Sequence, residues 1–168
     1  MIWNWYSILL IQKMLDWLSK TWFFTKLDII HTFNWICIHE DDEKYTVFWT
    51  WWELFKQLVM SFDLKNESSM FQHYINNKLH DFLDIFITVY INDILIYSFM
   101  LSEHQKHVQM ILEQLWETDL QCDIKKYKFH TIEMTYFKLI VFQEELKMNS
   151  TKIKTITNWK SSWNIHDI

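Results

Sequence analysis

A chain of 168 residues and 21.0 kDa is long enough for one packed domain and too short for two. Its 50% hydrophobic, 18% aromatic and 22% charged residues exclude a disordered segment, and its net charge of −5 argues against a free-standing nucleic-acid binder, which would need a basic surface. Gly, Pro, Ala and Arg are all missing. Average usage would supply roughly 20 Gly and Pro residues in this length, so ordinary folding pressure does not explain the composition.

Targeting and redox signals are weak in this sequence. Cys37 and Cys122 are far apart and show no metal or redox spacing, so we expect free thiols in a reducing compartment. The first ten residues lack a basic region and a small-residue cleavage site, and no apolar run approaches the roughly 18 residues of a membrane span. We therefore expect an intracellular protein, cytoplasmic or nuclear, that is not secreted and has no membrane partner.

The first third of the chain changes from helical to β-rich patterning. Apolar residues at helical spacing predict a short amphipathic helix over residues 8–18. Aromatic and β-branched residues predict strands over residues 23–28 and 35–39, which we expect to pair as a half-buried hairpin. The acidic residues 40–43 are typical of a solvated turn before the β-rich residues 45–48.

The middle of the chain combines a helix with a hairpin. Residues 66–69 supply polar capping groups for a helix whose apolar positions continue to Leu83 at a spacing of three or four. Two short apolar runs follow, over residues 85–90 and 94–97, and residues 91–93 separate them. This pattern predicts a tight β-hairpin with a polar tip.

The last third completes an alternating order of elements. A second amphipathic helix is predicted over residues 103–118, strands over residues 128–130 and 134–141, and a polar helical tail from Ser150. The order β-α-β-β-α-β predicts an α+β fold, with an antiparallel split-βαβ sheet of the ferredoxin-like kind and its helices on one face.

Acidic residues mark two places that this layout brings together. Asp28 ends one predicted strand, and Asn92 and Asp93 lie at the tip of the predicted hairpin. Carboxylates that converge on a sheet edge can hold two Mg²⁺ ions for phosphoryl transfer. An acid at a strand end is, however, more often a solvated turn residue, so spacing alone favours that simpler interpretation.

Five sequence blocks sharpen this interpretation. They are, in chain order, Phe24 to Ile29 (FTKLDI), Phe33-Asn34, Phe71 to Asn76 (FQHYIN), Val89 to Ser98 (VYINDILIYS) and His104 to Val108 (HQKHV). Their order and spacing resemble the reverse transcriptase of gypsy-type long-terminal-repeat retrotransposons over nearly the whole chain. The resemblance implies a single reverse-transcriptase domain over residues 1–168, with a fingers-side lead-in helix over 1–25, a polymerase palm over 26–145 and the start of a thumb over 146–168.

The resemblance also implies roles for individual residues. Asp28, Asn92 and Asp93 would hold the catalytic positions, with Asp28 and Asp93 as ligands of Mg²⁺. The nucleotide side would be formed by Ile29, Phe33 and Phe62, with Phe33 excluding a 2′-hydroxyl, and the primer grip by Phe137 and Lys138. The implied partners are an RNA or DNA template–primer and a deoxynucleoside triphosphate. The protease, RNase H and integrase regions of the parent polyprotein, and the basic fingers segment, are expected to lie outside this chain.

Departures from the family pattern predict an inactive copy. Asn92 stands where the first acid of the family's Tyr-x-Asp-Asp hairpin belongs, and an amide brings no charge to a divalent ion. Charged residues replace family glycines at Lys20, Asp63, Lys138 and Glu145. We interpret these as mutational decay and expect backbone strain, poor solubility and low stability. The alternative is a non-catalytic protein, either a decayed remnant or one co-opted as a nucleic-acid or protein binding module. A small metallohydrolase is disfavoured for want of further ligands.

Three further clusters have two interpretations each. A metal site on a helix face is less expected than solvated side chains for Glu103, His104 and His107. A base-stacking platform is less expected than decay from arginine for Trp49, Trp51 and Trp52. Contact with a phosphate backbone and a simple solvated surface are equally expected for Lys125, Lys126 and Lys128.

Overall fold

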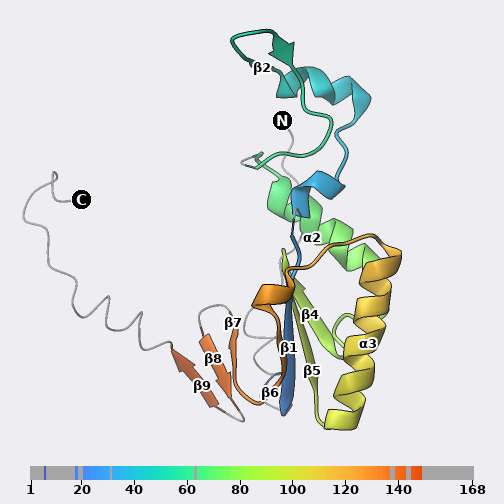
Figure 1. Ribbon diagram of the computed structural model, residues 1–168, viewed down its shortest axis with the longest axis vertical. Coiled ribbons are helices and arrows are strands. Elements are labelled where there is room, and N and C mark those ends of the chain that lie inside the picture. Colours follow the sequence, from blue (N-terminus) through green and yellow to red (C-terminus); the bar gives the residue numbers. More distant parts are fainter. Residues whose placement is uncertain are drawn as a thin grey trace, which may run out of the picture.

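A four-stranded antiparallel sheet organises the chain in the order β4-β5-β1-β6 (Figure 1). Its strands are β1 (Phe23–Asp28), β4 (Ile87–Tyr90), β5 (Asp93–Ser98) and β6 (Lys128–Thr131). The computed structural model describes residues 6, 18, 21–30, 32–62, 64–136, 139–142 and 145–148. The strand that comes first in the chain lies inside the sheet, so each edge of β1 is paired to a distant segment.

Two α-helices connect these strands. Helix α2 (Glu67–Lys78) packs against β4, and α3 (Leu101–Glu117) packs against β5 and β1. The apolar face of α3 is built from Val108, Ile111 and Leu115, which recur at helical spacing and are buried. The chain order β1-α2-β4-β5-α3-β6 and the strand order confirm the α+β, split-βαβ fold expected from the sequence.

Both faces of the sheet are covered. In β5, Ile94 and Ile96 face the core that the two helices close, whereas Leu95 and Tyr97 point to the opposite side. The opposite side packs against residues from outside the sheet: Leu18, Met134 and Tyr136. Burial on both faces explains why β5 reads as a continuous apolar run instead of an alternating one.

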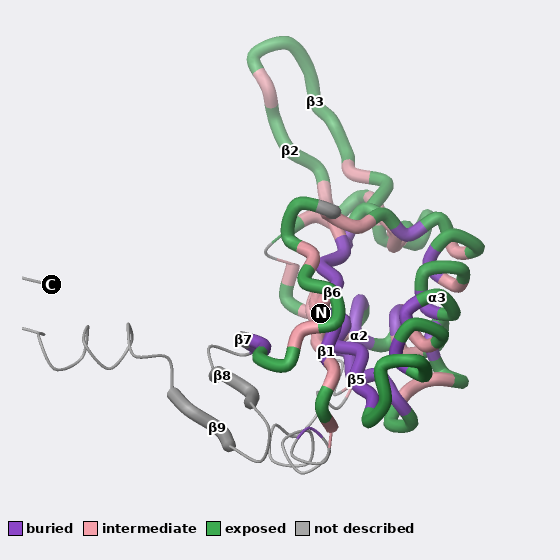
Figure 2. Tube along the Cα trace, turned by 60° about the horizontal axis from the view of Figure 1, so that its bottom comes forward, coloured by how far each residue is buried: buried purple, intermediate pink, exposed green. Residues whose placement is uncertain are grey.

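An exposed arm, residues 36–60, projects from the end of the sheet near α2 (Figures 1 and 2). It contains the 3₁₀ helix η2 (Glu40–Thr46) and the short hairpin of β2 (Phe48–Trp49) and β3 (Leu54–Phe55). Cys37 pairs with Val59 at its base. Figure 2 shows that most of the arm is exposed, whereas β1 and β5 of the sheet are largely buried.

The predicted pairing of residues 23–28 with residues 35–39 is wrong. A 3₁₀ helix, η1 (Thr32–Trp35), follows β1, and within residues 35–39 the described structure contains a single isolated bridge in place of a strand. β1 pairs with β5 and β6, whose long-range partners occupy both of its edges. The acidic residues 40–43 are mostly exposed, as expected, but they form part of η2 and not a simple turn.

Several element boundaries also differ from the expectation. Helix α2 ends at Lys78, with Leu79 as its C-cap, so the apolar residues up to Leu83 follow the helix. The predicted strand over residues 134–141 is a hairpin of β7 (Met134–Tyr136) and β8 (Leu139–Phe142), which also pairs with β9 (Glu145–Met148). The predicted helix over residues 8–18 and the tail from Ser150 fall outside the described residues, except for Leu18.

The one replaced glycine position that the structure describes, Glu145, shows no backbone strain. Lys20, Asp63 and Lys138 lie outside the described residues, and Glu145 does not have a positive φ. The described residues with positive φ are Asp84, Ile91, Asp119 and His130, at 62°, 52°, 58° and 50°. Ile91 is the most unfavourable of them because a β-branched side chain is poorly accommodated in the left-handed region.

Candidate active site

Asp28 and Asp93 lie opposite each other at one end of the sheet. They are the last residue of β1 and the first of β5, and the register pairs them directly. Both lie on the sheet face opposite the helices, because Phe24 and Leu95, which share their alternation, belong to the core on that side. Two like charges placed directly across an antiparallel pair repel each other, so this edge needs compensating groups.

Asn92 joins this pair through its side chain. Its Nδ2 donates a hydrogen bond of 2.8 Å to Asp28 Oδ1, and its backbone oxygen accepts one of 2.8 Å from the N–H of Ile29. The three residues predicted to form the catalytic centre are therefore brought together. The amide, however, acts here as a donor to a carboxylate and contributes no negative charge.

Two lysines neutralise the carboxylates. Lys126 Nζ lies 2.7 Å from Asp28 Oδ2, and Lys26 Nζ lies 2.7 Å from Asp93 Oδ2. Lys126 also lies 3.8 Å from Asp123 Oδ2. The hydrogen bond to Asp28 and the charge of that carboxylate raise the pKa of Lys126, which keeps its ammonium group protonated.

A buried glutamine fixes the hairpin turn that presents Asn92. Gln72 of α2 donates from Nε2 to the backbone oxygen of Val89 at 3.1 Å, and its Oε1 accepts from the N–H of Ile91 at 2.7 Å. These bonds hold the left-handed Ile91 in place beside the carboxylates. The side chain of Gln72 thus positions the turn. The sequence predicted Gln72 only as part of the FQHYIN block, with no role of its own.

Two of the three predicted nucleotide-side residues, Phe33 and Phe62, belong to an aromatic cluster beyond β1. Phe33 is buried and lies edge-on to Phe62, with ring centroids 5.1 Å apart, and to Phe71, at 6.0 Å. Phe62 is 72% exposed, so it covers Phe33 on the solvent side. Ile29 is buried in the core next to Asp28.

The two residues predicted to form the primer grip, Phe137 and Lys138, lie outside the described residues. The preceding Tyr136 is buried, its hydroxyl donates to the backbone oxygen of Asp93 at 3.3 Å, and the Lys26 ammonium lies 5.7 Å from its ring centroid. Burial, followed by the charge of Asp93, raises the pKa of Tyr136, so the hydroxyl remains a donor at all ordinary pH values.

The donor set at this edge does not fit a pair of divalent ions. Both oxygens of Asp28 accept hydrogen bonds, from Asn92 and Lys126, and Asp93 Oδ2 accepts one from Lys26. Within the described ranges, no three His, Cys, Asp or Glu side chains gather closely enough to hold a metal ion. A two-ion site needs more negative charge than two lysine-paired carboxylates offer.

The expectation that His104 is a solvated helix residue is wrong. Its side chain is fully buried, with Nε2 2.8 Å from Thr25 Oγ1 and Nδ1 2.9 Å from Ser98 Oγ. Ser98 Oγ also lies 2.7 Å from His107 Nδ1. Burial, followed by the nearby His130 and His107, lowers the pKa of His104 to about 4, so the ring is neutral at physiological pH.

One direction of hydrogen bonding satisfies this network. The N–H of His130 donates to Thr25 Oγ1, so the Thr25 hydroxyl can donate to His104 Nε2. His104 Nδ1–H then donates to Ser98, whose hydroxyl donates to His107 Nδ1. A neutral imidazole supplies the one donor and one acceptor that this order requires. The histidines therefore fasten α3 to β1 and β5.

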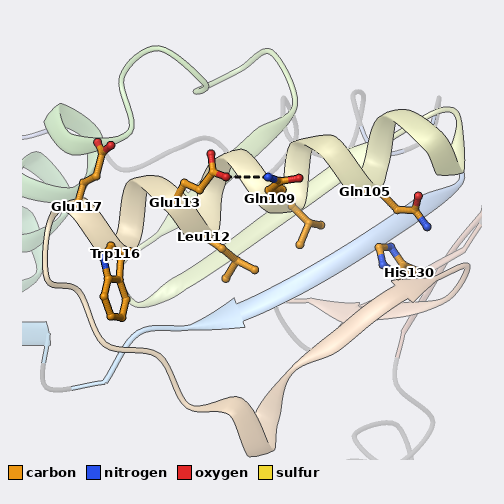
Figure 3. Close-up of a pocket in the computed structure, with 8 residues that line it drawn as sticks. Gln105, Gln109, Leu112, Glu113, Trp116, Glu117 and His130 are labelled. Atoms are coloured by element: carbon orange, nitrogen blue, oxygen red, sulfur yellow. Dashed lines mark hydrogen bonds between the residues drawn. The ribbon is translucent and has the colours of Figure 1, made fainter.

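Other surface features lie apart from the carboxylates. A pocket of about 550 Å³ runs between α3 and β6, and its lining residues include Leu112, Trp116 and His130 but none of the candidate catalytic residues (Figure 3). On the arm, Trp49, Trp51 and Trp52 are 83%, 101% and 92% exposed. Cys37 and Cys122 are free thiols, as expected.

Sequence reasoning missed the two lysines as partners of the carboxylates. Lys26 lies two residues before Asp28, so strand alternation places both on one face, and this signal was present in the sequence. Lys126 was identified only as part of a basic run, because no local pattern connects it to Asp28.

No helix in the described part of the chain is long and apolar enough to span a bilayer.

The sequence matches known proteins over most of its length. The profile of the family described as reverse transcriptase (RNA-dependent DNA polymerase) matches residues 4–163. The retrovirus-related Pol polyprotein from transposon 297 of Drosophila melanogaster is 30% identical over 154 residues, which are 92% of this chain and 14% of that protein. The transposon Tf2-3 polyprotein of Schizosaccharomyces pombe is 28% identical over 96% of this chain and 12% of that protein. The chain thus spans about an eighth of the length of these relatives.

Solved structures share the fold at low sequence identity. The foamy viral protease-reverse transcriptase in complex with RNA/DNA hybrid superposes with a TM-score of 0.80 at 19% identity and covers 95% of this chain and 21% of that chain. The same enzyme in complex with dsDNA gives a TM-score of 0.83 at 18% identity and covers 99% of this chain and 34% of that chain. At this identity the likeness establishes the fold.

Proposed function

The chain belongs to the reverse transcriptase (RNA-dependent DNA polymerase) family, and from this membership we propose that it is a polymerase palm that binds a template–primer duplex without adding nucleotides to it. The family assignment confirms the resemblance to retrotransposon reverse transcriptases. One observation carries the proposed inactivity: Asn92 Nδ2 donates to Asp28 Oδ1 at 2.8 Å, where the reaction of the family needs a second acid.

The proposed lesion is a loss of charge at the centre of the reaction. Template-directed addition of a deoxynucleotide to a primer 3′ end places the attacking and leaving oxygens between two Mg²⁺ ions. In this chain Asp28 and Asp93 are the residues that would face such ions, and the amide of Asn92 and the two lysine ammonium groups do not fit them. We expect the loss of a charged metal ligand at position 92 to reduce metal affinity or activity by about 10–100-fold or more.

The remaining residues support duplex binding. The structural neighbours are bound to an RNA/DNA hybrid and to dsDNA, and this chain shares their fold. Lys125 and Lys128 are exposed next to the carboxylate edge, where they can pair with phosphates, whereas Lys126 already pairs with Asp28. We assign the nucleotide side to Phe33 and Phe62, and the primer grip to Phe137 and Lys138, as part of the same proposal.

Duplex binding is measured by fluorescence anisotropy with a labelled RNA/DNA template–primer at several salt concentrations. We expect Lys125→Glu and Lys128→Glu to weaken binding and to reduce its salt dependence, because each removes a phosphate contact. Lys106→Glu, on the exposed side of α3, is the matched control and should have little effect. Equal losses in all three variants would indicate only a general charge effect and would contradict the proposed binding surface.

Primer extension tests the proposed inactivity. The full chain is incubated with template–primer, deoxynucleotides and Mg²⁺ or Mn²⁺, next to an Asn92→Asp variant. We expect no extension by the unmodified chain and detectable extension by the variant. Clear extension by the unmodified chain would refute the proposal.

The arm supports a second candidate function as a single-strand binding module. Three neighbouring tryptophans are almost fully exposed there, and aromatic side chains can stack on unpaired bases. Quenching of tryptophan fluorescence by a single-stranded oligonucleotide, and its loss in Trp51→Ser, would favour this function. The acidic residues of η2 on the same arm oppose it, since they repel phosphates.

A further inference from the structure

Each carboxylate of the candidate active site is paired with an ammonium group from the same chain. Lys126 Nζ is 2.7 Å from Asp28 Oδ2, and Lys26 Nζ is 2.7 Å from Asp93 Oδ2. We propose that Lys126 and Lys26 take the places of divalent cations at this edge, so that the palm is neutralised internally and folds and persists without Mg²⁺. The inference rests on the proposed loss of catalysis, but it concerns what replaces the ions.

Burial makes a counter-charge at Asp28 necessary. The side chain of Asp28 is only 11% exposed, and an ionised carboxylate in such a place is strongly destabilising unless it is paired and hydrogen-bonded. The Asn92 amide supplies one hydrogen bond and no charge. Lys126 supplies the charge, so the pair Asp28–Lys126 meets both requirements without an ion from solution.

The backbone around Lys126 holds it at this position. The N–H of Asp123 donates to the backbone oxygen of Asp28 at 2.9 Å, and Cys122 forms a bridge with Ile29. Lys126 ends the 3₁₀ helix η3 (Ile124–Lys126), and its N–H donates to the oxygen of Asp123 at 3.1 Å. The segment that carries the ammonium group is therefore hydrogen-bonded directly to the strand end that carries Asp28.

Lys26 is held on the second carboxylate by packing. It lies on the same sheet face as Asp93, and its ammonium group lies over the ring of Tyr136 at 5.7 Å from the centroid. The Lys26 and Asp93 side chains are each 25% exposed, so this pair is partly shielded from water. Cation–π contact adds to the ion pair and favours this position for the ammonium group.

Competition between lysines and ions has a measurable consequence. A divalent ion that binds Asp28 must first displace the Lys126 ammonium group and the Asn92 amide. These groups lie 2.7 Å and 2.8 Å from the two carboxylate oxygens of Asp28. Removing the ammonium group should therefore increase affinity for divalent ions. Removing a lysine that does not contact the carboxylates should not.

Mn²⁺ binding to the full chain tests the proposal, because the electron paramagnetic resonance signal of free Mn²⁺ reports binding without any need for activity. We expect Lys126→Gln to bind Mn²⁺ about tenfold or more tightly than the unmodified chain, comparable to the effect of changing a group that contacts a ligand. Lys125→Gln, at the adjacent exposed residue, is the matched control and should match the unmodified chain. Equal affinities in Lys126→Gln and Lys125→Gln would overturn the proposal.

Thermal unfolding keeps the proposal testable if Lys126→Gln folds poorly. We expect this variant to unfold at a lower temperature than Lys125→Gln and to recover part of the difference in saturating MgCl₂, because the ion then neutralises Asp28. Lys26→Gln should respond in the same direction through Asp93. Stabilisation of the unmodified chain by MgCl₂ to the same extent as the variants would overturn the inference.

These outcomes are separate from those of the proposed function. Mn²⁺ affinity and unfolding do not involve nucleic acid, whereas the proposed function is measured by duplex binding and primer extension. A chain that fails to bind duplex, but whose Lys126→Gln variant gains Mn²⁺ affinity, would refute the proposed function and leave the ion substitution standing.

Discussion

Restoring the missing acid at position 92 should lower the free energy of unfolding in the absence of divalent ions. Asn92→Asp replaces the amide nitrogen that lies 2.8 Å from Asp28 Oδ1 with a carboxylate oxygen. Two unit charges at that separation repel by about 6 kcal/mol at an effective dielectric constant of about 20, and by about 1.5 kcal/mol in bulk water. Asn92 is half-buried and can rotate, so we expect a net loss near the lower figure, about 2 kcal/mol in the free energy of unfolding.

Urea unfolding at neutral pH and low salt, without divalent ions, measures this loss. Asn92→Ala is the matched control, because it removes the same hydrogen bond, worth about 1 kcal/mol, without adding charge. The excess loss in Asn92→Asp should shrink when Mg²⁺ is added. It should also shrink as the pH falls, since repulsion raises the pKa of the new acid pair in the folded state and protonation at lower pH removes the repulsion.

An Asn92→Asp variant that is as stable as Asn92→Ala, or more stable, at neutral pH without divalent ions would refute this prediction. That result would mean that the two lysines already overcompensate the carboxylates, so the edge would tolerate a third negative charge. The effect of Mg²⁺ provides a second check, because a charge-repulsion loss must respond to a divalent cation more than to the same ionic strength of NaCl.

Three further predictions follow from burial and exposure. Burial lowers the pKa of His104 to about 4, from about 6.5 in the unfolded chain, so between these pH values the unfolded state binds a proton that the folded state does not. The free energy of unfolding should therefore fall by about 3 kcal/mol as the pH drops from 6.5 to 4, which urea unfolding measures. The His104→Gln variant should be less stable at neutral pH and should lose most of that pH dependence. Trp51→Ser with Trp52→Ser should raise solubility, measured by light scattering, with a change in unfolding free energy within about 0.5 kcal/mol, because both side chains are almost fully exposed. The purified chain should unfold below about 50 °C by calorimetry, the lower part of the mesophile range, because left-handed Ile91 adds strain and the arm exposes apolar surface.

The first of these predictions has a matched control within the chain, and each of the other two has an outcome that would contradict it. His80, which is exposed, should keep the unmodified pH dependence when changed to Gln, and an equal response of both variants would point to a global titration instead of the buried ring. Unchanged light scattering in the double tryptophan variant would show that the arm is not the source of association. A cooperative transition well above 50 °C would contradict the picture of a strained, decayed copy.

The helices and the inner strands could be predicted because their signals are local. β1 matches the predicted residues 23–28, and α3 differs from its predicted range by two residues at its start and one at its end. The β-α-β-β-α-β order was enough to predict the sheet, because short connections and antiparallel pairing leave few ways to bury both helices. The partner of residues 35–39 was not predictable, since pairing across the arm depends on a contact with Val59 that alternation does not encode.

In the candidate site, too, the local features were predictable from the sequence and the long-range contacts were not. Alternation in β1 and the hairpin spacing placed Asp28, Asn92 and Asp93 at one edge from the sequence, and the register confirms that they meet. His104 was misread because its helical position alone did not reveal the polar groups of Thr25 and Ser98 above it.

The sequence by itself determined the family, the order of elements and the loss of one acid, because these depend on residue identity and near-neighbour spacing. Only the tertiary structure decided what neutralises the remaining acids. Lys126 lies 98 residues from Asp28 along the chain, and their 2.7 Å contact exists only because the segment after α3 returns to the end of β1. Electrostatic pairing depends on distance in space, and folding sets that distance.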